Sequence, residues 1–279
     1  MLTSVRLVLN LDGCKMGDVL DFGGNNTNAV QSWRTRWRHY IKTAERNSSS
    51  ARITAENFIK LGGISKGSSI LDLGCGHGRI TELLVEKVPL LDIVGIDATR
   101  GMLDNFLVKS GANRSKIRLV CADVTRLPFD VGTFDAVVSS RVFQYLADPV
   151  LGVREALRVL KPGGFLVISI PNKLNPVKYL GYKGKLYSPF EVRAWFEACG
   201  LKDIKHGSMC FFPSSKRWKA LASSLEVGEE IPFIKYFGGN VVVKGRKEIQ
   251  PVPEISPTNP TQATALGSVC KAGSARGRR

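Results

Sequence analysis

Residues Ile70–Ile80 read ILDLGCGHGRI, and this stretch decides the fold. An apolar run that contains Asp72 is followed by three glycines at alternate positions and then by the start of an amphipathic run. Glycine lets the backbone turn tightly and lets a ligand approach where a Cβ would collide. The first turn of a helix offers unpaired N–H groups. The stretch therefore predicts a strand, a glycine-rich turn and a helix that together can hold a ligand.

The spacing of these glycines separates the turn from a dinucleotide-binding turn. The G-x-G-x-x-G fingerprint requires its third glycine one place later than Gly78, and this chain has Arg79 there. The missing glycine argues against a pyrophosphate cradle and disfavours a nicotinamide-dependent reductase.

Short apolar runs alternate with longer amphipathic runs along the rest of the chain. The predicted strands are 70–73, 91–96, 117–122, 134–139, 165–170, 201–210 and 240–244, and the predicted helices are 51–61, 79–87, 100–109, 150–160, 189–199 and 214–225. Strands that alternate with helices predict a parallel sheet with right-handed crossovers. We therefore expect an α/β, doubly wound fold: a mostly parallel sheet of seven strands with helices on both faces.

Two carboxylates end neighbouring predicted strands. Asp97 closes the second strand, nineteen residues after Gly78, and Asp123 ends the third. A carboxylate at the first position can accept both hydroxyls of a ribose, and Asp123 is placed to accept from an exocyclic amine. A Lys-Pro-Gly-Gly turn at 161–164 then leads into the fifth strand.

This succession of motifs resembles the class I S-adenosylmethionine-dependent methyltransferases, in particular the small-molecule branch that includes ubiquinone-biosynthesis enzymes. The resemblance covers about residues 51–247. It implies a Rossmann-like domain with an antiparallel last strand, S-adenosyl-L-methionine as the cofactor, and a transferase that methylates its acceptor. The cofactor-binding residues that it implies are Asp72, Gly74, Cys75, Gly76, Gly78, Asp97, Ala98, Met102, Asp123, Val124 and Ser139.

The resemblance also implies a role for each part of this set. Asp72 and the glycine turn would line the methionine part of the cofactor, and Asp97 would bind the ribose. Met102 would pack on the adenine, while Asp123 would accept from the adenine amine with the Val124 N–H beside it. Helix capping and turn geometry are the alternative explanations for these residues.

No catalytic residue follows from the resemblance, because the sulfonium already makes the methyl carbon electrophilic. The protein mainly has to align the acceptor and exclude water, and a general base is optional. Arg141 and Tyr145, which follow the fourth strand, are candidates. His39, on an aromatic N-terminal helix, is a third candidate, with a surface or core role as the alternative. We expect no metal site, because the six cysteines form no C-x-x-C pair and the three histidines lie far apart.

The chain divides by composition into three parts. We expect a flexible leader over 1–30, a methyltransferase domain over 31–248 that contains an N-terminal helical cap (31–61) and substrate-side insertions (172–236), and a disordered basic tail over 249–279. In the cap, Trp33, Trp37 and Tyr40 share one helical face and either form a lid or pack the helix onto the domain. The tail is rich in proline and has almost no large apolar groups to offset its ordering entropy.

The first fifteen residues resemble a signal peptide only weakly. Asn10 and Asp12 interrupt the apolar stretch, and no small-residue cleavage site follows. We prefer a frayed leader, or translation from Met16 rather than Met1. No apolar run reaches the roughly 18 residues of a membrane span, and scattered cysteines are typical of reduced thiols. We therefore expect a cytoplasmic protein.

The net charge of +16 is concentrated in residues 172–248, which carry fourteen basic and seven acidic residues. A basic face suits an anionic substrate, an acidic membrane surface or nucleic acid, or is simply solvated. We expect methyl transfer to a small-molecule acceptor, anionic or lipid-like, at oxygen. The alternatives are an RNA or other nucleic-acid methyltransferase and a non-catalytic cofactor-binding module. The acceptor, the methylated atom and the oligomeric state stay open at this point.

Overall fold

The computed structural model describes residues 19–21, 36–41, 48–110, 117–176, 182, 184–209 and 236–249, and every structural statement below concerns these residues. The tail from residue 250 onward, the predicted helix 214–225 and nearly all of the predicted leader lie outside the described residues. None of the described helices is both long enough and apolar enough to cross a membrane.

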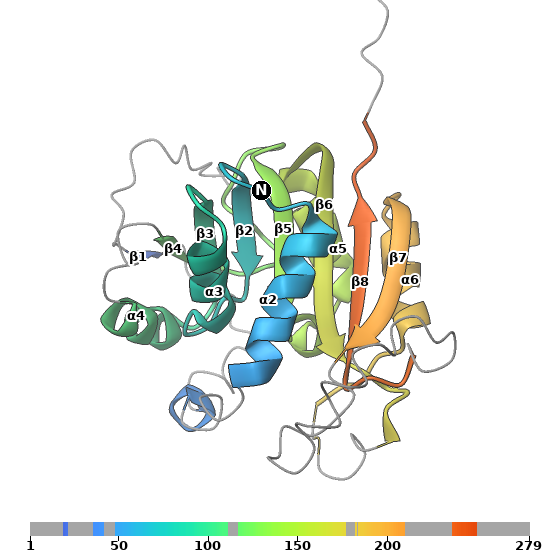
Figure 1. Cartoon of the computed structure of the whole chain (residues 1–279), viewed down its shortest axis with the longest axis horizontal. Helices are drawn as coiled ribbons and strands as arrows, with labels where there is room; N and C mark the ends of the chain where they lie inside the picture. Colours follow the sequence, from blue (N-terminus) through green and yellow to red (C-terminus); the bar gives the residue numbers. More distant parts are fainter. Residues whose placement is uncertain are drawn as a thin grey trace, which may run out of the picture. The chain divides into compact units, whose positions relative to one another are not determined.

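The described strands form one mixed sheet (Figure 1). They are β1 (Val19–Asp21), β2 (Ser69–Leu73), β3 (Asp92–Asp97), β4 (Ile117–Cys121), β5 (Phe134–Ser140), β6 (Leu160–Pro171), β7 (Lys202–Met209) and β8 (Asn240–Arg246), in the order β1-β4-β3-β2-β5-β6-β8-β7. Strands β1 to β6 pair in parallel, and β8 is antiparallel to both β6 and β7. The predicted Rossmann-like fold with an antiparallel last strand is confirmed. All seven predicted strands are present, and β1, from the segment predicted to be a leader, adds an eighth.

Helices cover both faces of this sheet. The described helices are α2 (Ser48–Gly62), α3 (Arg79–Lys87), α4 (Arg100–Lys109), α5 (Pro149–Val159) and α6 (Pro189–Ala198), with a 3-10 turn η4 (Phe143–Tyr145). Figure 1 shows α2 and α3 in front of the sheet and α5 behind it. Local sequence fixes their starts: Asp148 accepts hydrogen bonds from two N–H groups of the first turn of α5, and Ser188 forms a capping box with Glu191 at α6.

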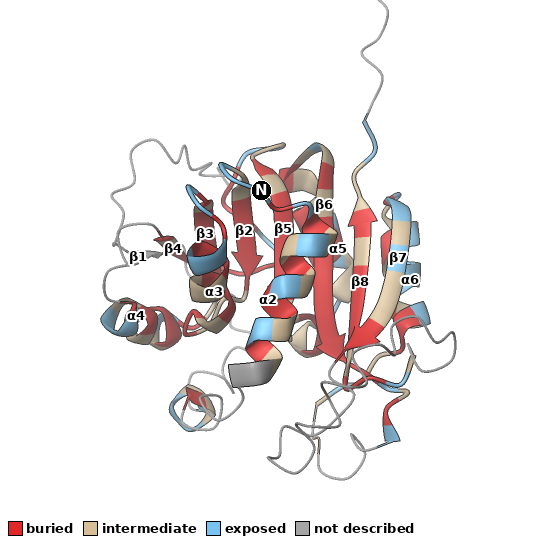
Figure 2. Ribbon diagram, viewed as in Figure 1, coloured by how far each residue is buried: buried red, intermediate tan, exposed pale blue. Residues whose placement is uncertain are grey.

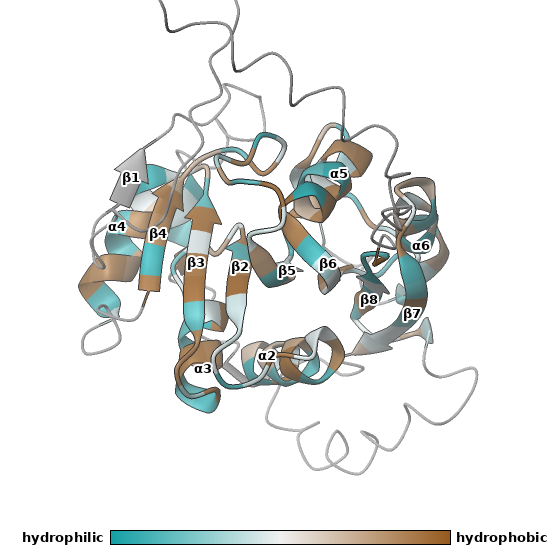
Figure 3. Cartoon of the chain, turned by 90° about the horizontal axis from the view of Figure 1, so that it is seen from above, coloured by the Kyte–Doolittle hydropathy of each residue, from teal (hydrophilic) through white to brown (hydrophobic). Residues whose placement is uncertain are grey.

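The alternation of side chains along each strand divides the core into two layers. In β2, Ile70 packs with α2, α3 and α4, whereas its neighbour Leu71 packs with α5 and α6. Both faces of the central strands are therefore buried (Figure 2), and their residues are mostly apolar (Figure 3). Strands that are buried on both faces need continuous apolar sequences. This is why the apolar runs of the sequence predict the strands.

The predicted Lys-Pro-Gly-Gly turn is part of a strand. Strand β6 begins at Leu160, and its register with β5 shifts from the pair Phe134↔Leu160 to the pair Ala136↔Phe165. The extra residues form an irregularity that Gly163, with a φ of 81°, can adopt.

Strand β2 is where the topology of the sheet reverses. Its neighbours are β3 on one side and β5 on the other, so the connections that follow β2 and β5 diverge at their carboxyl ends. Open α/β sheets bind ligands in the crevice at such a switch point.

Candidate functional site

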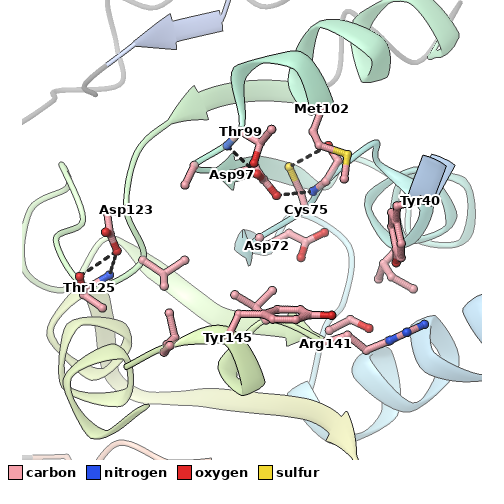
Figure 4. Close-up of a pocket in the computed structure, with 18 of the residues that line it drawn as sticks. Tyr40, Asp72, Cys75, Asp97, Thr99, Met102, Asp123, Thr125, Arg141 and Tyr145 are labelled. Carbon is pink, nitrogen blue, oxygen red and sulfur yellow. Dashed lines mark hydrogen bonds between the residues drawn. The ribbon is translucent and has the colours of Figure 1, made fainter. Parts of the chain in front are cut away.

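A cavity of about 540 Å³ lies at the carboxyl ends of β2, β3, β4 and β5 (Figure 4). Nine of the eleven predicted cofactor residues line it: Asp72, Gly74, Cys75, Gly76, Asp97, Ala98, Met102, Asp123 and Val124. The structure thus gathers residues that are up to 52 positions apart in the sequence. The other two predicted residues, Gly78 and Ser139, lie outside the lining.

Two glycines of the turn after β2 have different surroundings. Gly76 has a φ of 59°, and a Cβ placed on it would meet nothing within 4 Å, so its backbone faces open space. Gly78 has a φ of 85°, and a Cβ there would lie 2.0 Å from the ring of Phe106. Gly76 therefore leaves room for a ligand, whereas Gly78 leaves room for the side chain that packs α4 beneath the turn.

Asp97 connects the glycine turn to the start of α4. Its Oδ2 accepts from the Gly76 N–H at 3.0 Å, and its Oδ1 accepts from the Thr99 N–H at 2.8 Å. Burial raises the pKa of this carboxyl group, and the two backbone N–H groups oppose that rise. A carboxylate offers about four acceptor positions, so Asp97 keeps capacity for further donors while its orientation is fixed.

Asp72 is the most unusual carboxyl group of the site. It is 1% exposed, and its Oδ2 accepts from the Thr81 hydroxyl at 2.7 Å. Burial raises its pKa to about 7; the Thr81 bond lowers it and the nearby Asp97 raises it further. A buried carboxylate of this kind favours a cationic partner, because the partner's charge offsets the cost of desolvation.

Asp123 and Met102 face another part of the cavity. Oδ1 of Asp123 accepts from both the N–H and the hydroxyl of Thr125, each at 2.8 Å. Met102 is 4% exposed in the first turn of α4 and supplies an apolar, polarisable wall. Met102 offers a flat apolar group one face to pack on, and Asp123 offers a carboxylate to donate to.

Two candidate residues for catalysis line the cavity, and one does not. Arg141 and Tyr145 lie on the side of the cavity opposite Asp97 and Met102 (Figure 4). Arg141 has a φ of 60°, and its N–H donates to the Ser169 carbonyl at 2.7 Å. His39 is exposed and outside the lining.

The described part of the helical cap reaches the cavity. Tyr40 lines it and meets the buried ring of His77 edge-on, with the ring centroids 5.9 Å apart. Trp37 packs on α4, where a Cβ on Gly101 would lie 2.8 Å from its ring. Tyr40 therefore agrees with a lid over the cavity, and Trp37 agrees with packing of the helix onto the domain. Trp33 lies outside the described residues.

Ser139 has a role at the base of the site. Its hydroxyl donates to the Leu73 carbonyl at 2.9 Å and is fully buried, so it joins the ends of β5 and β2. The next residue, Ser140, lines the cavity instead.

Sequence reasoning missed Thr99 and Thr125, which also line the cavity. A signal for the two threonines exists, because Asp97 and Asp123 each begin an Asp-x-Thr triplet. In both triplets the carboxylate accepts the N–H two residues on, the Asx-turn pattern. Lys185 also lines the cavity and comes from the connection before α6, within the predicted substrate-side insertions.

Cys75 does not provide a nucleophile. Burial raises the pKa of its thiol well above the usual range, and the nearby Asp72 and Asp97 raise it further, so the thiol stays protonated. Within the described ranges, no three His, Cys, Asp or Glu side chains are grouped as a metal site would require.

Residues 71–168 match the family model described as a methyltransferase domain. The chain is 40% identical over 99 residues to a demethylmenaquinone methyltransferase of Deinococcus radiodurans, covering 36% of this chain and 41% of the relative. It is 31% identical over 101 residues to a malonyl-[acyl-carrier protein] O-methyltransferase of Priestia megaterium, covering 36% of each. The chain thus spans less than half the length of these curated relatives.

A solved structure shares the fold over most of the chain. An S-adenosylmethionine-dependent methyltransferase of Thermotoga maritima, described as a possible histamine N-methyltransferase, superposes with a TM-score of 0.58 at 17% identity, covering 79% of this chain and all of the other. Fold and cavity define an α/β domain with a cavity at the switch point of the sheet. Residues 71–168 carry a methyltransferase domain, and the similarities support the class I S-adenosylmethionine-dependent methyltransferases of small-molecule type, with S-adenosyl-L-methionine as the cofactor. The predicted family and cofactor are confirmed.

Proposed function

We propose that this protein transfers the methyl group of S-adenosyl-L-methionine to an oxygen atom of an anionic or lipid-like small molecule. The observation that carries the proposal is the division of one cavity into an acidic side and a basic side. Asp72, Asp97 and Asp123 line one side, and Arg141 and Lys185 come from the connections that complete the other; Arg79, at the start of α3, and Asp148, before α5, also line the cavity.

The acidic side suits the cofactor. The Asp72 carboxylate would pair with the ammonium of the methionine part, which explains why a buried group with a raised pKa is useful there. Asp97 would accept from the ribose hydroxyls, while Met102 and Asp123 would hold the adenine. The open space at Gly76 would let the cofactor approach the backbone.

The basic side suits an oxygen nucleophile. The sulfonium is its own leaving group, so the protein has to align the acceptor oxygen with the methyl group and exclude water. Arg141 and Lys185 would favour an ionised oxygen and disfavour a protonated amine. An acceptor that is already ionised needs no general base, which agrees with the exposed position of His39. The O-methyltransferase of Priestia megaterium is a relative with the same preference in its name.

The parts of the chain outside the sheet take supporting roles in this proposal. Residues 31–61 would cap the cofactor, residues 172–236 would shape the acceptor pocket, and residues 249–279 would be dispensable. We place the protein in the cytoplasm, which agrees with the free thiols of Cys75, Cys121 and Cys199. Deletion of residues 249–279 should leave turnover within twofold of the full chain.

Calorimetric titration with S-adenosylhomocysteine, the expected product, tests the proposal first. We expect micromolar binding at one site per chain, followed by transfer of labelled methyl groups to acceptors in a screen of small acids, phenols and amines. A folded protein that does not bind S-adenosylhomocysteine would favour the alternative of a non-catalytic module. Methyl transfer to RNA that persists at high salt would favour a nucleic-acid methyltransferase.

A further inference from the structure

The basic side of the cavity contains a small polar network. Arg141 and Tyr145 line the cavity directly after β5. The side chain of Tyr182, from the connection between β6 and α6, hydrogen-bonds to Tyr145 and lies close enough to Arg141 to feel the charge of its guanidinium. Residues 37 to 41 positions apart in the sequence therefore meet at one wall of the cavity.

The hydroxyl of Tyr182 is held from both sides. Nε2 of Gln144 donates to it at 3.2 Å, and its other side-chain partner is Tyr145. Burial and the neighbouring Tyr145 raise the pKa of Tyr182, so its hydroxyl stays neutral. Tyr182 can therefore orient its neighbour but does not act as a base.

Gln144 is buried in a way that lowers the stability of the fold. It is 2% exposed, and within the described part of the chain no residue donates to its buried Oε1. A buried acceptor without a donor lowers stability, and an apolar side chain of similar size would avoid this cost. What the apolar side chain could not supply is the bond from Nε2 to Tyr182.

We propose that Arg141 and Tyr145 form a subsite for the carboxylate of an acid acceptor, and that Gln144 and Tyr182 are positioning residues that orient Tyr145 within it. This inference rests on the proposed function and names its substrate class. A guanidinium with a hydroxyl donor beside it matches the two oxygens of a planar carboxylate, and Lys185 adds a further positive charge to the same cavity.

The chemistry balances without a base. A lone pair of one carboxylate oxygen forms the new bond to the methyl carbon while the carbon–sulfur bond breaks. The sulfur keeps that electron pair and becomes a neutral thioether. The products are a methyl ester and S-adenosylhomocysteine, and no proton has to be removed from the acceptor.

The test measures binding of matched acids and amides to the full chain saturated with S-adenosylhomocysteine. The probes are benzoate with benzamide and octanoate with octanamide. We expect at least one acid to bind ten times more tightly than its amide. Arg141→Asn, which suits the left-handed backbone at this position, should abolish that preference. Tyr182→Phe and Gln144→Met should each reduce it three- to tenfold with unchanged affinity for S-adenosylhomocysteine.

Matched controls separate orientation from general damage. Tyr187→Phe removes a hydroxyl from the same connection, and Arg193→Gln removes a charge on the exposed face of α6; both should keep the acid preference. In a Tyr145→Phe background, Tyr182→Phe should have no further effect, since it acts through Tyr145.

If S-adenosylhomocysteine binds but neither acid is preferred over its amide, this inference is wrong and the proposed function stands. The same conclusion follows if the preference survives Arg141→Asn. If S-adenosylhomocysteine does not bind the folded protein, the proposed function fails and this inference fails with it.

Discussion

The two sides of the cavity are built by different means. On the acidic side, Asp97 and Asp123 each accept from the backbone N–H two residues on, and Asp97 also accepts from the Gly76 N–H of the glycine turn. On the basic side, Tyr145 is held by Tyr182, which lies 37 positions away in the connection before α6. The acidic side is thus fixed largely by turns at the strand ends, and the basic side by a contact with the connection before α6.

This difference has a functional meaning under the proposed activity. A cofactor that is always the same can be bound by turns whose geometry a few residues determine. An acceptor that differs between relatives is better bound by side chains on connections, because connections can change without disturbing the sheet. Substitutions on each side can therefore show whether the two sides are as separate as their construction implies.

The largest effect is expected at Gly78. Alanine would need a left-handed backbone, which costs about 1–2 kcal/mol, and its Cβ would overlap the Phe106 ring, for which overpacking costs roughly 1–3 kcal/mol more. Gly78→Ala should therefore lower the free energy of unfolding by about 2–5 kcal/mol in denaturant titration.

Gly76→Ala is the matched control. It has the same backbone requirement but no atom within 4 Å of the new Cβ, so it should lose only about 1–2 kcal/mol of stability. Its methyl group would point into open space at the cavity. The affinity of the folded variant for S-adenosylhomocysteine should therefore fall as well, beyond any effect of the lower stability. Equal stability of the two variants would contradict the packing role of Gly78.

Asp97→Ala should weaken S-adenosylhomocysteine binding more than tenfold. The variant removes the proposed ribose acceptor, and hydrogen bonds to a charged group contribute about 1.5–3 kcal/mol. It also leaves the Gly76 and Thr99 N–H groups without their acceptor. Asp97→Asn, which keeps the size and shape of the side chain, is therefore the comparison variant. Calorimetry that gives an unchanged dissociation constant for Asp97→Ala would remove the ribose assignment.

Asp72→Asn should separate binding from stability. The native pKa of Asp72 is raised from 3.8 to about 7, so the folded protein holds this proton where the unfolded chain has lost it. Stability from this group is therefore present at low pH and is lost as the pH rises from about 4 through 7.

At pH 8 the asparagine variant should consequently be more stable than the wild type without cofactor, on the order of 2–4 kcal/mol. Its affinity for S-adenosylhomocysteine should nevertheless be about tenfold lower. Wild-type affinity should increase between pH 6 and pH 8 as the carboxylate forms, whereas that of Asp72→Asn should stay flat. Parallel pH profiles of the two proteins would show that Asp72 does not pair with the cofactor's ammonium.

The sequence predicted the acidic side well because its signals are local. Apolar runs set the strands, α3 and α4 begin and end at the predicted residues, and each strand-end carboxylate follows its run directly. The Asp-x-Thr triplets show that more could have been predicted, since an Asx turn needs only three consecutive residues.

The basic side could not be predicted to the same depth. The left-handed backbone of Arg141 depends on its bond to Ser169 in the next strand, and the Gln144–Tyr182 bond joins segments 38 positions apart. Strand β6 began earlier than its apolar run suggested because pairing with β5 overrode the turn composition of Lys161–Gly164. Tertiary contacts decide each of these features, and periodicity does not record them.

The smallest effect is expected for Lys185→Gln. Lys185 is exposed and comes from the connection before α6, so it belongs to the side of the cavity that the cofactor does not need. Exposed charges contribute about 0–1 kcal/mol, and the affinity for S-adenosylhomocysteine should stay within twofold of the wild type, as it should for Lys173→Gln on the surface near α6. A fall of more than fivefold in Lys185→Gln alone would mean that the basic side also holds the cofactor. The two sides would then form one site, and the charge difference between them would no longer argue for an anionic acceptor.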